Sequence, residues 1–209
     1  MGIPVEVPGL DTIVPSLDEG RVVVAESGAD PAKSFFVRRL GLTAIREEIP
    51  VTFVTSRDRA ELLSQLELES PDAPWREGDL TVVEEDSLTE TNGYGATGGF
   101  LAVDSFSFLT LDLPGPRLAR LLRGLRGLSH EKRTIVLLAT DRGMADPRSE
   151  AVVNHLADGV LQFHAREGPE GVVRFLRIPK WIDGRFFDRN IYYQFDGSRI
   201  AVDLRRRVL

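Results

Sequence analysis

Short apolar runs alternate with amphipathic segments over the first three quarters of the chain. The β-branched run Val22–Val24 is typical of a strand that is buried on both faces. Apolar residues then recur at helical spacing from Phe35 to Ile49, which predicts a helix over 31–48 that Pro50 ends. Further strands are predicted at 51–55, 79–85, 100–104 and 133–140, and further helices at 57–68, 114–128 and 148–156.

The pattern changes after residue 158. Four segments of extended character follow one another, at 159–166, 171–181, 190–195 and 199–204, with turn residues between them. Alternating strands and helices predict an α/β fold in which helices flank a mostly parallel sheet. The late segments are expected to extend that sheet at one edge as antiparallel C-terminal strands.

The segment 21–40 reads as a strand, a short loop and a helix that opens on Lys33 and Ser34. This is the architecture of a phosphate-binding loop, whose pattern is G-x-x-x-x-G-K-[ST]. Ser27 and Ala32 stand where that pattern has its two glycines. Because a Cβ at the second position hinders the closest approach of a phosphate, the loop is a degenerate form of the motif. An ordinary amphipathic helix start is the alternative interpretation.

Asp30 and Pro31 alter the loop further. Proline has no N–H to give to a phosphate, and the aspartate brings a like charge into the cradle. Two such charges about 4 Å apart repel by about 4 kcal/mol at an effective dielectric constant of about 20. The same pair is a strong helix-start signal, with Asp30 as N-cap and Pro31 at the first helical position. We therefore expect a loop capped by its own carboxylate, which supplies the negative charge that a phosphate would bring.

Composition limits the classes of function. The chain has 209 residues, a formal net charge of −6 and no cysteine, which predicts one domain without disulfides, cysteine nucleophiles or thiolate metal sites. No apolar run is long enough to cross a bilayer and no leader is evident, so a cytoplasmic protein without membrane insertion is expected. His130, His155 and His164 lack ligand-like spacing with carboxylates, and we predict no metal site.

A series of short motifs resembles a known family. VPGLD, RVVVAESGADPAKS, LAVDSFSFL, IVLLAT and then HLADGVLQF with VVRFLRIPK occur in this order. The series resembles the KaiC-like branch of the RecA superfamily of P-loop ATPases, with a degenerate Walker A motif. Because the resemblance covers nearly the whole chain, it implies a single RecA/KaiC-like domain over 1–209.

The resemblance assigns roles to four positions. Asp104 matches the Walker B aspartate, which holds magnesium through water, and its alternative role is a turn cap. Thr140 matches a residue that senses the γ-phosphate, and otherwise is a plain strand-end threonine. If nucleotide binding is retained, Lys33, Ser34, Asp104 and Thr140 are the expected contacts to ATP and Mg²⁺.

Two departures from the family pattern argue against hydrolysis. Thr55 and Ser56 stand where family ATPases carry a glutamate that polarises water, and neither is a general base near neutral pH without activation. The family also reaches a neighbouring subunit's nucleotide with a K-x-R pair. Here Lys180 remains as a candidate for that interface, but Ile182 replaces the arginine. We therefore assign no catalytic residue. The alternative role of Lys180 is a solvated lysine on an edge strand.

Three interpretations of function follow. The first is a non-hydrolysing regulatory or scaffold subunit without a cofactor, which forms a homo-oligomer or a hetero-oligomer with another RecA-like subunit. Late aromatic residues give it a candidate interface, unless these rings lie in the core: Trp181, Phe186, Phe187, Tyr192 and Tyr193. The second is a divergent KaiC-like ATPase or nucleotide sensor that binds ATP and Mg²⁺.

The third interpretation is a nucleic-acid-binding RecA relative. Arginines recur every three residues in the predicted helix at 114–128, at Arg117, Arg120, Arg123 and Arg126. Arg205–Arg207 add a basic cluster, although a solvated tail explains them as well. The net charge of −6 gives this interpretation no support.

Overall fold

The computed structural model describes residues 2–28, 30–70, 78–89, 94, 98–168, 171–182 and 187–203. Most of the glycine-rich stretch 90–97, Phe186 and Arg205–Arg207 lie outside these residues. The predictions that concern them are therefore not addressed by the structure.

A nine-stranded sheet forms the centre of the described part of the chain, in the order β5-β4-β6-β7-β3-β8-β9-β10-β11. All neighbours from β5 to β8 are parallel, and those from β8 to β11 are antiparallel. The parallel strands are β3 (Val22–Ser27), β4 (Val51–Thr55), β5 (Leu80–Glu84), β6 (Phe100–Val103), β7 (Ile135–Asp141) and β8 (Gly159–Gly168). The antiparallel strands are β9 (Gly171–Lys180), β10 (Phe187–Phe195) and β11 (Ile200–Val202). The predicted fold class is confirmed.

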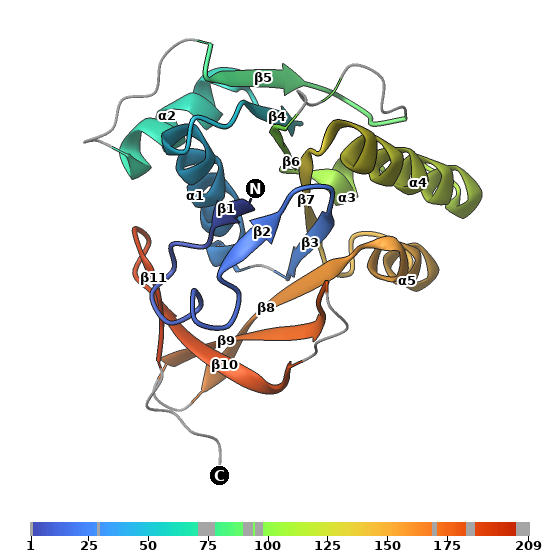
Figure 1. Ribbon diagram of the computed structural model, residues 1–209. Coiled ribbons are helices and arrows are strands. Elements are labelled where there is room, and N and C mark those ends of the chain that lie inside the picture. The colour runs from blue at the N-terminus through green and yellow to red at the C-terminus, as the bar shows by residue number, and fades with distance from the viewer. Residues whose placement is uncertain are drawn as a thin grey trace.

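Helices cover both faces of this sheet (Figure 1). On one face lie α1 (Ala32–Arg46), α2 (Arg59–Glu69) and a small antiparallel pair, β1 (Gly2–Pro4) with β2 (Ser16–Asp18). On the other lie α3 (Phe106–Leu109), α4 (Gly115–Lys132) and α5 (Pro147–Leu156). Each group of helices buries its own apolar cluster against the sheet, so the central parallel strands β3, β6 and β7 are buried on both faces, as their continuous apolar runs predict.

Side-chain periodicity explains how the helices dock. The predicted leucine stripe of α4 is buried against the sheet, and Leu125 has no exposed surface. In α1, Gly41 faces the ring of Phe53 on β4 so closely that a Cβ there would lie 2.7 Å from two ring carbons. Glycine thus allows α1 to pack directly on the sheet.

Three local features differ from the sequence prediction. The β1–β2 pair was not expected because residues 1–20 are rich in turn formers. Strand β6 ends at Val103 and not at Asp104, because the backbone turns there into the short helix α3. The central helix α1 is shorter than the predicted 31–48, since Glu48 has a positive φ of 58°.

The sheet order places several polar strand ends together. In chain order β3 is followed by β4, but β7 and β6 lie between them in the sheet. The carboxyl ends of β3, β4, β6 and β7 therefore lie together along one end of the sheet, where open α/β sheets bind their ligands. That end carries Ser27, Thr55, Asp104 and Asp141.

Candidate functional site

The loop between β3 and α1 places the carboxylate of Asp30 at the start of α1. Asp30 Oδ1 accepts a hydrogen bond from the Ala32 N–H at 3.0 Å. Pro31 already has helical dihedral angles, φ −67° and ψ −15°, and its carbonyl accepts from the Phe35 N–H at 3.1 Å. The N-cap of α1 is Pro31, one residue later than predicted, and the side chain of Asp30 before it accepts one N–H of the first turn.

Asp30 also joins this loop to the antiparallel end of the sheet. Its side chain is only 1% exposed; Tyr193 Oη donates to Oδ2 at 2.7 Å, and Arg174 Nε lies 3.5 Å from Oδ1. Burial, and next the hydrogen bond to the Asp30 carboxylate, raises the pKa of Tyr193 well above its usual range. Tyr193 on β10 and Arg174 on β9 therefore fix the position of the loop carboxylate.

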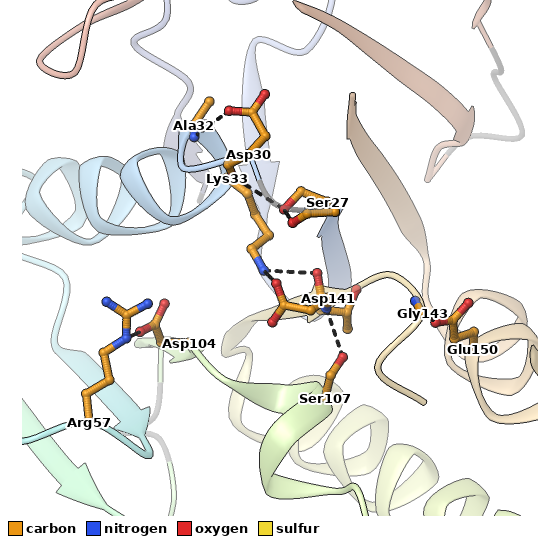
Figure 2. Close-up of polar contacts among 12 residues, drawn as sticks. Ser27, Asp30, Ala32, Lys33, Arg57, Asp104, Ser107, Asp141, Gly143 and Glu150 are labelled. Carbon is orange, nitrogen blue, oxygen red and sulfur yellow. Dashed lines mark hydrogen bonds and ion pairs between the residues drawn. The ribbon is translucent and has the colours of Figure 1, made fainter. Parts of the chain in front are cut away.

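Lys33 is buried in the first turn of α1 and points toward the end of β7. Its Nζ donates to the Thr140 carbonyl at 3.0 Å and pairs with Asp141 Oδ1 at 2.5 Å (Figure 2). The Asp141 N–H in turn donates to Ser107 Oγ at 2.9 Å. Ser34 lies half-buried next to Lys33. Asp141 was not among the residues expected at the nucleotide site, yet this carboxylate is the ion-pair partner of the loop lysine.

Asp104 follows β6 and its side chain has no exposed surface. Arg57 Nε lies 3.5 Å from Asp104 Oδ2 (Figure 2), an ion-pair distance that is too long for a good hydrogen bond. Neither carboxylate oxygen has a hydrogen-bond partner within the described part of the chain. Arg57 comes directly after Thr55 and Ser56. The positive charge beside Asp104 therefore comes from the segment where the family resemblance places a glutamate.

A second polar cluster lies beside the first and was not predicted. Glu26 is buried on β3 and accepts from Arg142 Nε at 2.7 Å and from Asn154 Nδ2 at 3.0 Å. Arg142 also lies 3.3 Å from Nδ1 of His164, whose ring stacks on Phe175 with centroids 4.7 Å apart. Arg142 is thus bound to Glu26 and lies next to the His164 ring. Glu26 was missed because it sits inside the apolar run VVVAES.

His164 gives this cluster a pH dependence. Burial, and next the positive charge of Arg142, lowers the pKa of His164 from its ordinary value of 6.5. Between pH 6.5 and the lower folded pKa the unfolded chain binds more protons, so the free energy of unfolding falls as the pH falls. We expect the His164→Gln variant to lose less stability than the wild type between pH 7 and pH 5.5, measured by urea unfolding. The exposed-site control His130→Gln should behave like the wild type; equal losses in all three proteins would contradict the prediction.

Lys180 at the end of β9 holds the C-terminus of α5. Its Nζ donates to the carbonyls of Asn154 at 3.4 Å, His155 at 2.8 Å and Ala157 at 2.5 Å. Burial lowers its pKa from the ordinary value. The ammonium is therefore used inside the chain as a helix C-cap. Its predicted reach to a neighbouring subunit stays a prediction.

The late aromatic residues do not form the expected surface. Trp181 and Tyr193 are buried, with 4% and 5% of their surface exposed. Phe187 packs against the same core, and Tyr192 is half-buried. Trp181, Phe187 and Tyr193 therefore pack in the same apolar cluster as α1 and do not form the expected surface.

The arginines of α4 have different environments. Arg117, Arg120 and Arg123 are exposed, whereas Arg126 pairs with Asp158 at 3.1 Å. In the residues the structure describes, no three histidine, aspartate or glutamate side chains gather as metal ligands would. Nor is any described helix both long and apolar enough to pass through a membrane.

Comparison with known proteins supports the fold. No family model matches the chain, and no curated protein matches it. Among solved structures, the KaiC-like protein PH0186 from the hyperthermophilic archaeon Pyrococcus horikoshii OT3 is 20% identical, with 97% of this chain and 99% of that one covered at a TM-score of 0.75. The flagellar accessory protein FlaH from Methanocaldococcus jannaschii is 15% identical, with 97% and 98% covered at the same TM-score. The chain therefore has the RecA-like fold of KaiC-like proteins.

Proposed function

We propose that this chain is a non-hydrolysing RecA-like protein that acts as a regulatory or scaffold subunit through protein association. One observation carries the proposal. Each charged side chain at the expected nucleotide site already has a partner of opposite charge within the chain. Asp30 pairs with the N-terminus of α1 and with Arg174, Lys33 with Asp141, and Asp104 with Arg57.

These residues do not fit a tightly bound triphosphate. A phosphate over α1 needs the N–H groups and the positive dipole end of the helix. The Asp30 carboxylate already accepts the Ala32 N–H and lies at that end. Displacing this carboxylate would separate it from Arg174 and Tyr193 inside the protein, and leaving it would place two anions side by side. Lys33 would also have to exchange Asp141 for the phosphate. Several kcal/mol of lost binding corresponds to roughly a 10³-fold weaker complex.

The segment after β4 carries Thr55 and Ser56, and no carboxylate, at the positions where the family resemblance places a water-activating glutamate. The Thr55 hydroxyl accepts a hydrogen bond from the Arg57 N–H at 3.1 Å, which orders the turn after β4. Arg57 is a cation and cannot act as a general base. We therefore propose no catalytic residue and no resident cofactor.

Without nucleotide hydrolysis, a RecA-like protein can still act by associating with other subunits. We propose side-by-side assembly with a second copy or with another RecA-like subunit in the cytoplasm, with residues 1–209 as one domain. The neighbour FlaH is described as a flagellar accessory protein, which is a role beside other components. Light scattering over a wide concentration range tests self-assembly. A monomer at every concentration, with no RecA-like partner recovered with it, would count against the proposal.

The decisive experiment is a titration of the protein with ATP and Mg²⁺. We expect no change in melting temperature at millimolar nucleotide and no measurable heat of binding. A ligand present at 100 times its dissociation constant would stabilise the fold by about 2.7 kcal/mol, which a thermal melt detects easily. Lys33→Ala is the matched control and should give the same null result. Micromolar binding that disappears in this variant would overturn the proposal.

One observation favours a second candidate, a nucleotide sensor that binds ATP with Mg²⁺. The buried carboxylate of Asp104 has two oxygens without hydrogen bonds, and such oxygens suit the water shell of a magnesium ion. Lys33, Ser34 and Thr140 would then contact the nucleotide. The same titration separates the candidates, because the sensor requires saturable binding that depends on Mg²⁺.

A further inference from the structure

A cavity of about 180 Å³ lies on the opposite side of Asp141 from Lys33. It is enclosed by the loop between β7 and α5, the first turns of α5, and residues from α3 and α4. None of the roles proposed above uses this space. Its lining combines an apolar wall with a group of carboxylates, and this combination defines the kind of ligand that fits.

The apolar wall is formed by Phe106, Leu111, Leu118, Met144 and Val153. Leu111 and Met144 are 52% and 43% exposed, and both belong to the few large apolar side chains that are exposed in the described part of the chain. Phe108, 51% exposed, lies on the same helix α3 as Phe106. Exposed apolar side chains at the mouth of a cavity are costly to hydrate, and an apolar ligand body would cover them.

The charged part of the lining is strongly one-sided. Four carboxylates line the cavity, Glu26, Asp141, Asp146 and Glu150, against one guanidinium, Arg142. Asp141 is paired with Lys33 at 2.5 Å from outside the lining. Arg142 is already paired with Glu26 at 2.5 Å. A hollow lined by one sign of charge concentrates counter-ions of the other sign.

The carboxylates on the α5 side are held in place by the backbone. Asp146 caps α5 through the N–H groups of Arg148 and Ser149, at 2.9 and 3.2 Å. Glu150 Oε1 accepts from the Gly143 N–H at 2.5 Å (Figure 2). Hydrogen bonds from Ser149 lower the pKa of Asp146, so this group stays charged well below neutral pH. The carboxylates on this side of the cavity are therefore held in position without a bound ligand.

We propose that this cavity binds a small organic cation, an amine with an alkyl or aryl body. The ammonium lies among Asp141, Asp146 and Glu150, and the body lies against Leu111 and Met144. Because Asp141 also holds Lys33, the bound ammonium and the loop lysine share one carboxylate. The site does not depend on the proposed absence of nucleotide binding, since it lies on the other side of that carboxylate.

The test uses three probes with the same body. Benzylamine, benzyl alcohol and benzoate share a phenyl ring that carries one further carbon, and their polar groups are a cation, a neutral hydroxyl and an anion. They are titrated into the full chain by calorimetry at low salt. We expect a dissociation constant of about 1 mM or below for benzylamine, a reasonable value for a ligand of this size. Benzyl alcohol should bind at least tenfold more weakly, and benzoate should show no binding. Equal binding of the three probes, or none by any, overturns the proposal.

Two variants locate the site. Glu150→Gln keeps an oxygen to accept the Gly143 N–H but removes the charge, and should weaken benzylamine binding by about tenfold, as the loss of a charged hydrogen-bond partner does. Glu131→Gln removes an exposed carboxylate of α4 that does not line the cavity, and should leave binding unchanged. Thermal melts of both variants check that they are folded. Equal effects of the two substitutions would mean that benzylamine responds only to net charge, which contradicts the proposal.

Discussion

Replacing Asp30 by alanine is expected to lower the free energy of unfolding by about 3–5 kcal/mol, the usual result of removing one partner from a buried ionic network. The substitution leaves the Tyr193 hydroxyl, the Ala32 N–H and the Arg174 guanidinium without their shared acceptor inside the protein. It also removes the side-chain acceptor at the start of α1. Urea unfolding at pH 7 measures the loss from the shift of the midpoint at constant slope.

Two milder substitutions separate the parts of this effect. Asp30→Asn keeps an oxygen for the Ala32 N–H and loses the charge, so it should cost clearly less than the alanine variant. Tyr193→Phe removes one hydrogen bond to a charged group, which costs about 1.5–3 kcal/mol. In the double variant of Asp30→Ala and Tyr193→Phe the two losses should not add, because both remove the same contact. Asp30→Ala with stability within 1 kcal/mol of the wild type would show that the loop does not depend on this carboxylate.

The architecture was predictable because it depends on signals that are local in the sequence. The spacing of the valines in β3 and of the leucines in α4 is enough to predict a buried strand and an amphipathic helix. Both elements are confirmed. The position of Asp30 at the start of α1 is a signal of the same kind, since the carboxylate and the N–H that it accepts lie only two residues apart.

The charge pairs of the candidate site could not be predicted in this way. Lys33 and Asp141 are 108 residues apart, and they meet only because β7 lies next to β3 in the sheet. Arg57 reaches Asp104 because β4 and β6 are neighbours. Strand order is a property of the whole fold, and the apolar pattern of a strand does not state which strand lies beside it. Aligning the residues after each parallel strand would have shown that these side chains share one edge, but not which of them pair.

The burial of the late aromatic residues also depends on which strands lie side by side. Trp181 and Tyr193 were candidates for an interface, with burial in the core as the alternative, and the structure has both in the core. The ring of Trp181 packs against Gly159, where a Cβ would lie 2.9 Å from a ring carbon. A small residue on β8 therefore makes room for a large one that follows β9. This complementarity between strands is invisible in either segment alone.

Arg57→Ala is expected to destabilise the fold by about 1–3 kcal/mol, because it leaves the Asp104 carboxylate buried without a counter-charge. The effect is smaller than that of Asp30→Ala, since Arg57 is 36% exposed and lies 3.5 Å away. The second change Asp104→Asn removes the uncompensated charge and should restore most of the lost stability. Urea unfolding of the two single variants and the double variant gives the coupling between the residues directly. Losses that simply add would show that the pair contributes nothing.

The same variant discriminates between the two candidate functions. Removing Arg57 frees a buried carboxylate at the position where a nucleotide's magnesium would lie, while Asp30 still occupies the N-terminus of α1. If the chain is a non-hydrolysing scaffold, ATP with Mg²⁺ should leave the melting temperature of Arg57→Ala unchanged, as in the wild type. If Arg57 alone blocks a sensor site, nucleotide and Mg²⁺ together should stabilise this variant, and Asp104→Asn should abolish the gain. The Asp30 carboxylate before α1 and the Arg57 guanidinium beside Asp104 are thus two separate obstacles to nucleotide binding. The thermal melts show which of them excludes the nucleotide.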